Sequence, residues 1–502
     1  MSVLLALQSA PLPRVGGPAI LWPAVVYFLA VAAIGIWATR RTRTASDFFV
    51  AGKRIGVWTL AIAAMSATLS GFAFVGGPGL VYTLGLGAVF IVLPASLTTT
   101  MSAWVLAKRM RLLGEARGLI TVPDAIGARY RSPAAQGLAA VAILCALVGY
   151  LATNLLALGL VLDAVFGVGL GWGIWIGTVV VLAYSAAGGI LAGVYTDVFQ
   201  GGVMLLSSVL VFRYALDSGG GMAGISRTIL AADPGFLSPW GSLAPLAALS
   251  FFFVFGIGVL GQPHVIHKYY MLKDPLRLRW YPLLMTGALL LTLLLFVGVG
   301  LAVKAQVASG GMAPLTRADD ATPLFLLHFT PSLLAGVVFA GVAAAIMSTV
   351  NSFLSIGAAA ITHDLPRALG RVPRNELLGG RLATLAIAVL AGLVAQVSGV
   401  LVAFLGIFGW GLFASTLVPA LAIGLNWPGA TRSGAIASIL TGLVVTLTGE
   451  TLAYFRVYTF PAGVTVSGLG LVASLLVFFV VSRLTRHQAD DIDPDVRRVM
   501  EI

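Results

Sequence analysis

Long, continuously apolar stretches alternate along the chain with short stretches that carry charges or Gly/Pro clusters. A transmembrane helix needs about 20 predominantly apolar residues, and charges mark where it leaves the membrane. Transmembrane β-strands would instead alternate apolar and polar residues, so the pattern excludes a β-barrel. It predicts thirteen spans, at 19–39, 57–82, 87–107, 134–163, 170–186, 197–216, 246–266, 281–304, 332–360, 382–398, 400–425, 433–454 and 463–483.

Composition supports the same class of protein. Of the 502 residues, 59% are hydrophobic and 10% are charged, whereas a soluble globular domain carries roughly 25% charged residues. A water-soluble enzyme is therefore excluded. Glycine, at 60 residues, allows close helix packing and helix breaks in a membrane. We expect an all-α polytopic membrane protein that forms one transmembrane domain over residues 1–502.

The net charge of +12 (30 basic minus 18 acidic residues) is distributed unevenly between the two sides of the predicted membrane. Loops after the odd-numbered spans hold 24 Lys and Arg residues, and such residues stay preferentially on the cytoplasmic side. The other side holds six, namely Arg14, Arg213, Arg227, Lys304, Arg317 and Arg456. This predicts a cell-membrane protein with its N-terminus outside and its C-terminus in the cytoplasm, and gives no reason to expect a nucleic-acid partner.

Two predicted helices are interrupted at equivalent places. Gly76-Gly77-Pro78-Gly79 lies in the second span, and Gly261-Gln262-Pro263-His264 lies in the seventh, after Gly256 and Gly258. Both helices should unwind there, because proline removes a backbone donor and glycine leaves the backbone unshielded. The spacing predicts an inverted 5+5 repeat over 57–216 and 246–425, with extra helices at 19–39, 433–454 and 463–483. This LeuT-like arrangement is typical of secondary transporters. The alternative is that these glycines only allow packing or flexibility.

Polar residues inside the spans are candidates for a cation site. The ninth span carries Ser348, Thr349, Asn351 and Ser352 in an otherwise apolar helix, and sodium prefers hard oxygen ligands. Alternatively, these side chains bond their own helix or a neighbouring one. Asp197 opens the sixth span, where it either caps the helix or holds a cation. His264 and His267 have metal-ligand spacing but lack a third ligand.

Several stretches together resemble the solute:sodium symporter family, and most closely its sodium/proline branch. These stretches are Ser46-Asp47-Phe48-Phe49, Gly52-Lys53-Arg54, Gly76-Gly77-Pro78-Gly79, Thr121-Val122-Pro123-Asp124, Arg129-Tyr130, Thr196-Asp197 with Gln200, Gly261-Gln262-Pro263-His264, Ala344 to Thr349, Asn426-Trp427 and Gly434-Ala435. The resemblance covers nearly the whole chain. It implies sodium-coupled solute import by alternating access, with Na⁺ as the only metal and no catalytic residues.

The resemblance also implies particular sodium ligands. They are the carbonyls of Ser66, Leu69 and Ala345 and the hydroxyls of Ser348 and Thr349. In some members a second sodium site would map to Asp197, Ser348, Asn351 and Ser352, although Asn351 replaces the usual serine.

The implied substrate site lies between the two helix breaks, at Ser70, Gly71, Phe72, Phe74, Tyr150, Phe255, Val259 and Gln262. Tyr150 matches a substrate-side tyrosine of the proline branch, but Phe255 and Val259 stand where that branch has tryptophan and tyrosine. Gly71 and Phe72 replace the acidic and amide residues of sugar-transporting members. An amino acid such as proline or a small monocarboxylate therefore fits best. The alternatives are a sugar, a vitamin or a sialic-acid-like solute, and the alternative role of the aromatic residues is packing.

Two other classes of function are alternatives to transport. An intramembrane enzyme would need a nucleophile with a base, or a metal cluster, and neither is visible in the spans. A transport-fold sensor would need a partner contact, for which the acidic tail with Asp490, Asp491, Asp493 and Asp495 is the candidate. The expected partners are a small-molecule substrate and the lipid bilayer, without an obligate protein partner.

Overall fold

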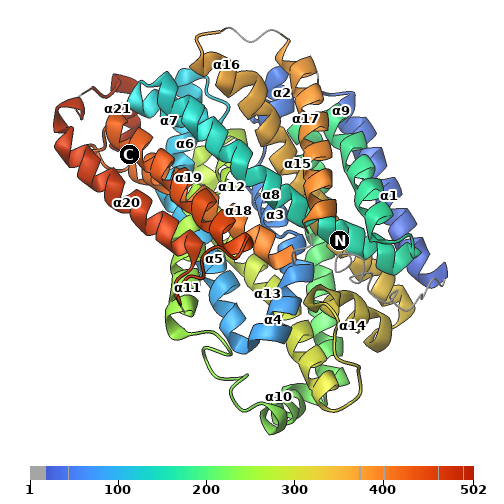
Figure 1. The fold of residues 1–502 in the computed structure, drawn as a ribbon. Coiled ribbons are helices and arrows are strands. Elements are labelled where there is room, and N and C mark those ends of the chain that lie inside the picture. Colours follow the sequence, from blue (N-terminus) through green and yellow to red (C-terminus); the bar gives the residue numbers. More distant parts are fainter. Residues whose placement is uncertain (1–17, 43, 372–374, 399–401, 462, 490) are drawn as a thin grey trace.

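The computed structural model describes residues 18–502 except 43, 372–374, 399–401, 462 and 490 (Figure 1). Residues 1–17, at the N-terminus whose orientation is predicted, lie outside the described residues. Residue 400, where one predicted span begins, also lies outside them. Helices form nearly all regular structure in the described part, which has a single isolated bridge between Ile55 and Leu272. Eleven described helices are long and apolar enough to cross a membrane, and Val57–Thr68 and Leu170–Ala183 are shorter apolar helices.

The helices follow the predicted spans closely. Those that correspond to spans are α1 (Pro18–Thr39), α3 (Val57–Thr68) with α4 (Gly77–Leu84), α5 (Val89–Ser102), α8 (Pro133–Phe166), α9 (Leu170–Ser218), α11 (Pro245–Gly258) with α12 (Pro263–Ile266), α13 (Tyr281–Ala308), α15 (Ser332–Ala359), α17 (Glu376–Val397), α18 (Val402–Leu417), α19 (Arg432–Tyr454) and α20 (Val466–Leu484).

Short helices gather at the two ends of the bundle. One end carries α2 (Ala45–Val50), α6 (Lys108–Arg117), α7 (Val122–Tyr130), α16 (Leu365–Ala368) and α21 (Pro494–Met500). The opposite end carries α10 (Gly221–Ala232) and α14 (Ala321–Phe329) (Figure 1). Between these ends, α15 is buried along most of its length and packs against α1, α8, α9 and α17.

The fifth and sixth predicted spans are joined in α9 rather than separated by a loop. A straight helix of 49 residues would be about 73 Å long, more than twice the thickness of the hydrocarbon core. However, Ala183 lines the same pocket as Thr39 and Arg40, and Tyr195 packs edge-to-face against Trp37, so both positions lie near the last turns of α1. The helix therefore bends between residues 183 and 195, and each half is long enough to act as a separate span.

The first helix break lies seven residues before its predicted place. α3 ends at Thr68, and Leu69 has an extended backbone with φ −81° and ψ 107°. In an uninterrupted helix the N–H groups of Gly71 and Phe72 would donate to the carbonyls of Ala67 and Thr68. They donate instead to Asn154 Oδ1 (2.9 Å) and to Ser70 Oγ (3.2 Å). The break thus frees two carbonyl oxygens at the end of α3.

The glycine-proline cluster that was predicted to unwind is helical. Gly76 and Gly77 have helical backbone angles, and Pro78 occupies the first turn of α4. Proline removes the donor for the carbonyl four residues before it. That carbonyl, on Phe74, accepts a hydrogen bond of 2.7 Å from the Thr322 hydroxyl. Because Thr322 satisfies the freed carbonyl, the helix can continue through the cluster as a π-helix over residues 72–76.

The second break lies where it was predicted. Gln262 separates a short 3₁₀ segment (Val259–Gly261) from α12 and has φ −79° and ψ 106°. These angles differ from those of Leu69 by no more than two degrees. The two interrupted helices therefore share one local backbone conformation, as the two halves of a repeat would.

Gly77 allows α4 to approach α13. A Cβ atom at Gly77 would lie 2.0 to 2.9 Å from three ring carbons of Phe296. We expect Gly77→Ala to lower the free energy of unfolding by about 1–3 kcal/mol, because overpacking forces strained side chains. Thermal unfolding of the purified protein measures this change. Gly202→Ala, which would place a methyl group in open space, should change stability little. Failure of Gly77→Ala/Phe296→Leu to regain stability would contradict this explanation.

Candidate cation and substrate sites

Three backbone carbonyls converge on one buried hydroxyl between α3 and α15. Thr349 Oγ1 lies 3.0 Å from Ala67 O, 3.2 Å from Leu69 O and 3.0 Å from Ala345 O. A hydroxyl has one proton and can donate it to one carbonyl at a time. The remaining carbonyl oxygens, together with the hydroxyl oxygen, form the kind of uncharged set of hard ligands that suits a small monovalent cation.

The structure brings most of the predicted sodium ligands to this point. Leu69, Ala345 and Thr349 meet directly, and Ser348 is buried next to Thr349 on the same helix. Ser66 is buried in the last turns of α3, where its hydroxyl contacts Met204 Sδ at 3.9 Å. Ala67 was not predicted. Its carbonyl becomes available because the N–H of Gly71, its partner in an unbroken helix, donates to Asn154 instead.

A buried ion pair joins α9 to the second interrupted helix. Asp197 Oδ2 accepts a hydrogen bond from Lys268 Nζ at 2.9 Å, and both side chains are essentially inaccessible to solvent. Asp197 lies inside α9 rather than at a helix start, so the capping alternative is wrong. The predicted seventh span ends at residue 266 and so leaves Lys268 in the following loop. The structure buries it in a 3₁₀ extension of α12, His267–Met271.

Four buried side-chain oxygens on α9 and α15 have no partner at normal hydrogen-bond geometry, and the Ser348 hydroxyl is near enough to Asp197 to favour its charged form. They are Asp197 Oδ1, Ser348 Oγ, Asn351 Oδ1 and Ser352 Oγ. The three α15 residues follow an i, i+3, i+4 pattern and so share one helix face. Gly193, one turn before Asp197 on α9, lies against the Asn351 amide. The predicted second set of sodium ligands therefore lies at one α9–α15 contact, while its binding of a second sodium stays a prediction.

The two histidines that were considered as metal ligands do not form a metal site with each other. His264 packs between Phe353 and Tyr150, with ring centroids 4.6 Å and 6.2 Å away, and His267 Nε2 lies 2.9 Å from Ile120 O. In the described residues, the clustered potential metal ligands are Asp124, His363 and Asp364.

This acidic cluster is a hydrogen-bonded network that connects helices. His363 bonds Asp124 at 2.9 Å and Glu376 at 3.0 Å, and Thr121 donates to Asp364 at 2.6 Å. The network ties α7 to the end of the ninth span and to α17. The sequence shows each of these residues but does not show that they lie together, because their proximity depends on packing between distant segments.

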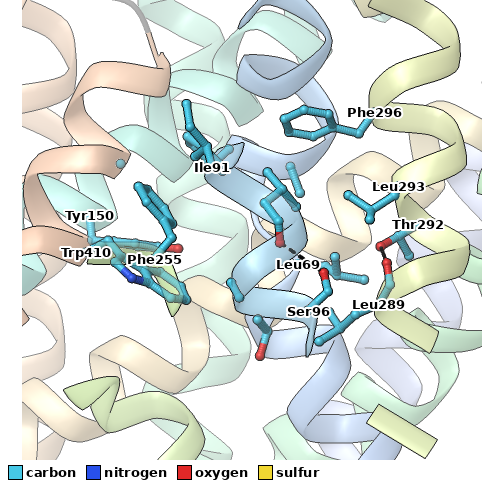
Figure 2. Close-up of a pocket in the computed structure, with 16 residues that line it drawn as sticks. Leu69, Ile91, Ser96, Tyr150, Phe255, Leu289, Thr292, Leu293, Phe296 and Trp410 are labelled. Carbon is cyan, nitrogen blue, oxygen red and sulfur yellow. Dashed lines mark hydrogen bonds between the residues drawn. The ribbon is translucent and has the colours of Figure 1, made fainter. Parts of the chain in front are cut away.

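A small apolar pocket lies beside the first helix break (Figure 2). Figure 2 shows Tyr150, Phe255 and Trp410 on one side, residues of α13 on the other, and Leu69 between them. The cavity volume is about 40 Å³, so the pocket is narrow in this conformation. Its lining comprises Thr68, Leu69, Phe72, Ala73, Ile91, Val92, Ala95, Ser96, Tyr150, Phe255, Leu289, Thr292, Leu293, Phe296, Gly406 and Trp410.

Three of the predicted substrate residues line this pocket, namely Phe72, Tyr150 and Phe255. The other five do not line it but are buried around the breaks, and they are Ser70, Gly71, Phe74, Val259 and Gln262. Ser70 and Gly71 hold the first break, as described above. Gln262 donates to Gly258 O at 3.1 Å and to Trp410 O at 3.3 Å, and so joins the second break to α18.

Trp410 is a pocket residue that was not predicted. Its ring stacks on Phe255 with centroids 5.2 Å apart and an interplanar angle of 18°, and Phe255 stacks on Phe72 at 6.1 Å. An indole from α18 therefore lies beside the position where the proline branch would have its own tryptophan. Nothing in the local sequence around Trp410 distinguishes it from an ordinary membrane tryptophan.

The acidic tail folds back onto the same chain. Arg117 pairs with Asp493 and lies 3.2 Å from Asp495, and Arg131 lies 2.6 Å from Asp491. The hydrogen bond from Arg117 holds the pKa of Asp493 below its usual value. Asp490 lies outside the described residues. The sensor hypothesis assigns the tail carboxylates to contact with a partner protein. Here Asp491, Asp493 and Asp495 pair with arginines of the same chain.

Comparison with known proteins gives a consistent result over almost the full chain. A family model described as the sodium:solute symporter family matches residues 48–442. The osmoregulated proline transporter OpuE of Bacillus subtilis (strain 168) is 28% identical over 482 residues, covering 92% of this chain and 94% of the relative. A sodium/proline symporter of Staphylococcus aureus (strain JH9) is 28% identical over 499 residues and covers 95% of each chain.

Two solved structures are similar in fold. A sodium-coupled sialic acid symporter in a substrate-bound, outward-open state superimposes with a TM-score of 0.76 at 19% identity, covering 93% of this chain and 98% of that chain. Mhp1, a nucleobase-cation-symport-1 family transporter in a closed conformation, gives 0.55 at 13% identity, with coverage of 91% and 99%. Both have the LeuT fold, which confirms the predicted all-helical membrane architecture.

Proposed function

This chain belongs to the sodium:solute symporter family, a family of transporters rather than enzymes, and from that premise we propose that it imports a small amino acid such as proline, or a small monocarboxylate, together with sodium. Sodium is a transported co-substrate here rather than a resident cofactor. The observation that carries the proposal is the convergence of the Ala67, Leu69 and Ala345 carbonyls on Thr349 Oγ1.

Leu69 is the proposed link between ion binding and solute binding. Its carbonyl lies 3.2 Å from Thr349 Oγ1, and the same residue lines the apolar pocket. A sodium ion bound by Leu69 O would fix the backbone of the break, and with it one wall of the pocket. Sodium would thereby favour the arrangement of the pocket that binds the solute, and the solute would favour sodium binding to the same extent by thermodynamic linkage.

The pocket lining supports a small and largely apolar solute. The lining contains no Lys, Arg, Asp or Glu, and its hydroxyl groups come from Thr68, Ser96, Tyr150 and Thr292. A sugar or a sialic acid presents many hydroxyl groups, which would need more hydrogen-bond partners than this lining supplies. The named proline transporters among the relatives agree with this choice, although identity of 28% does not fix a substrate.

Uptake into proteoliposomes tests the proposal directly. With an inward sodium gradient, we expect radiolabelled L-proline or a member of a panel of small amino acids and monocarboxylates to accumulate above equilibrium. Replacing sodium with choline should abolish the accumulation. Sodium-independent uptake would contradict sodium coupling, and uptake of only sugars or sialic acids would contradict the proposed substrate class.

We further propose that the end with α7, α16 and α21 faces the cytoplasm of the cell that carries the protein in its plasma or inner membrane. This follows from the 24-to-6 division of basic residues, of which Lys268 proves to be buried. In a Cys145→Ser background, Ser309→Cys should react with an impermeant thiol reagent on intact cells, and Leu369→Cys should react only after permeabilisation. Both positions are exposed. The reverse pattern would contradict the orientation.

A further inference from the structure

We propose that the Lys268 ammonium is the counter-charge of Asp197 and takes the place of a second sodium ion. One sodium ion therefore binds per protein molecule. The inference rests on the proposed sodium site at Thr349 and adds a stoichiometry to it. It concerns a buried ionic group that the first sodium site and the solute pocket do not use.

The geometry of the pair supports a permanent counter-charge. Lys268 Nζ lies 2.9 Å from Asp197 Oδ2, which is a normal charge-assisted hydrogen bond. Both side chains are fully buried. Lys268 extends from α12, directly after the second break, whereas Asp197 lies in α9, so the contact depends on packing between the two repeats. Neither residue has a salt-bridge partner besides the other among the described residues.

Charge balance then distinguishes the pair from a second sodium site. An isolated carboxylate is costly to bury, so Asp197 needs one positive charge close by. Lys268 supplies that charge, and the pair is neutral overall. A sodium ion added to the same place would lie beside the Lys268 ammonium, and the two positive charges would repel each other in an apolar interior where charge interactions are weakly screened.

The neutral oxygens at the α9–α15 contact differ from the ligands of the first site. At the first site, backbone carbonyls of Ala67, Leu69 and Ala345 converge on one hydroxyl. At the α9–α15 contact, by contrast, the neutral oxygens belong to the side chains of Ser348, Asn351 and Ser352. The Lys268 ammonium bonds Asp197 and none of these three oxygens.

Equilibrium binding of ²²Na⁺ to the purified full-length protein tests the proposal without needing the solute. We expect one sodium per chain and a Hill coefficient near one for the unchanged protein and for Lys268→Arg. Lys268→Gln removes the built-in cation and leaves Asp197 ionised beside the same oxygens. We therefore expect this variant to bind two sodium ions, with a Hill coefficient above one. The double variant Asp197→Asn/Lys268→Gln should return to one.

Each outcome decides the matter. Two sodium ions in the unchanged protein would overturn the proposal and leave sodium coupling intact, whereas no sodium binding would overturn both. A folded Lys268→Gln protein that still binds one ion would also overturn it. The control Lys53→Gln, whose lysine bonds Gly114 O at 2.7 Å away from the site, should keep one sodium. If Lys268→Gln does not fold, the ion count of the unchanged protein and of the double variant still decides between one and two.

Discussion

Asp197→Asn should lower the free energy of unfolding by about 3–5 kcal/mol and abolish sodium-driven uptake. The substitution removes the negative charge but leaves the Lys268 ammonium buried, with no carboxylate near it. Sodium should not rescue this variant, because the charge left behind is itself positive. Thermal unfolding in detergent at several sodium concentrations, together with uptake into proteoliposomes, measures both effects.

Two further variants test whether charge balance is the cause. Asp197→Asn/Lys268→Gln removes both charges and should recover most of the thermal stability that the single substitution loses. Asp217 lies on the same helix, but its pair with Arg213 is exposed, so Asp217→Asn should change stability by less than about 1 kcal/mol. Equal losses in Asp197→Asn and in the double variant would show that packing, not charge, is responsible.

Thr349→Ala should raise the sodium concentration for half-maximal uptake at least tenfold, which corresponds to about 1.4 kcal/mol of binding free energy. The substitution removes the hydroxyl on which the three carbonyls converge. Adding Ser348→Ala should raise the value further, toward a hundredfold, because it removes the second predicted hydroxyl ligand. Sodium titration of uptake, repeated as sodium-dependent thermal stabilisation, gives the values.

Two controls accompany this prediction. The first keeps a hydroxyl at position 349, and the second removes a buried hydroxyl away from the site. Thr349→Ser retains the ligand and should stay within about threefold of the unchanged protein. Thr384 is a buried threonine on α17 whose hydroxyl bonds its own helix at Gly380 O, so Thr384→Ala should leave sodium dependence unchanged. Normal sodium affinity in both Thr349→Ala and Ser348→Ala would mean that the ion binds elsewhere.

Much of this fold follows from short-range pattern. Apolar length located the spans, because a bilayer imposes nearly the same thickness on every helix that crosses it. The second break was also placed correctly, since Gln262 precedes a proline, and the residue before proline disfavours helical angles. The hydroxyls of Ser348 and Thr349 were conspicuous because polar residues are scarce in such helices.

The remaining features depend on contacts between distant segments. The unwinding expected at Gly76 to Gly79 is prevented by Thr322, which lies about 250 positions later and satisfies the carbonyl that Pro78 frees. Lys268 lies just beyond the predicted span, and its partner Asp197 is 71 positions away in sequence, so local sequence does not show that it is buried. Trp410 enters the pocket only through the packing of α18 beside the second break. Local composition does not predict contacts between residues so far apart in sequence.

The neutrality of the Asp197–Lys268 pair bears on how the membrane potential acts on the transport cycle. Moving one elementary charge across 100 mV is worth about 2.3 kcal/mol, whereas a carboxylate and an ammonium that move together contribute no net charge. On this basis the membrane potential does no work on this pair when the empty carrier reorients. The potential acts on the sodium-loaded form, so current should accompany solute entry and vanish in the return step.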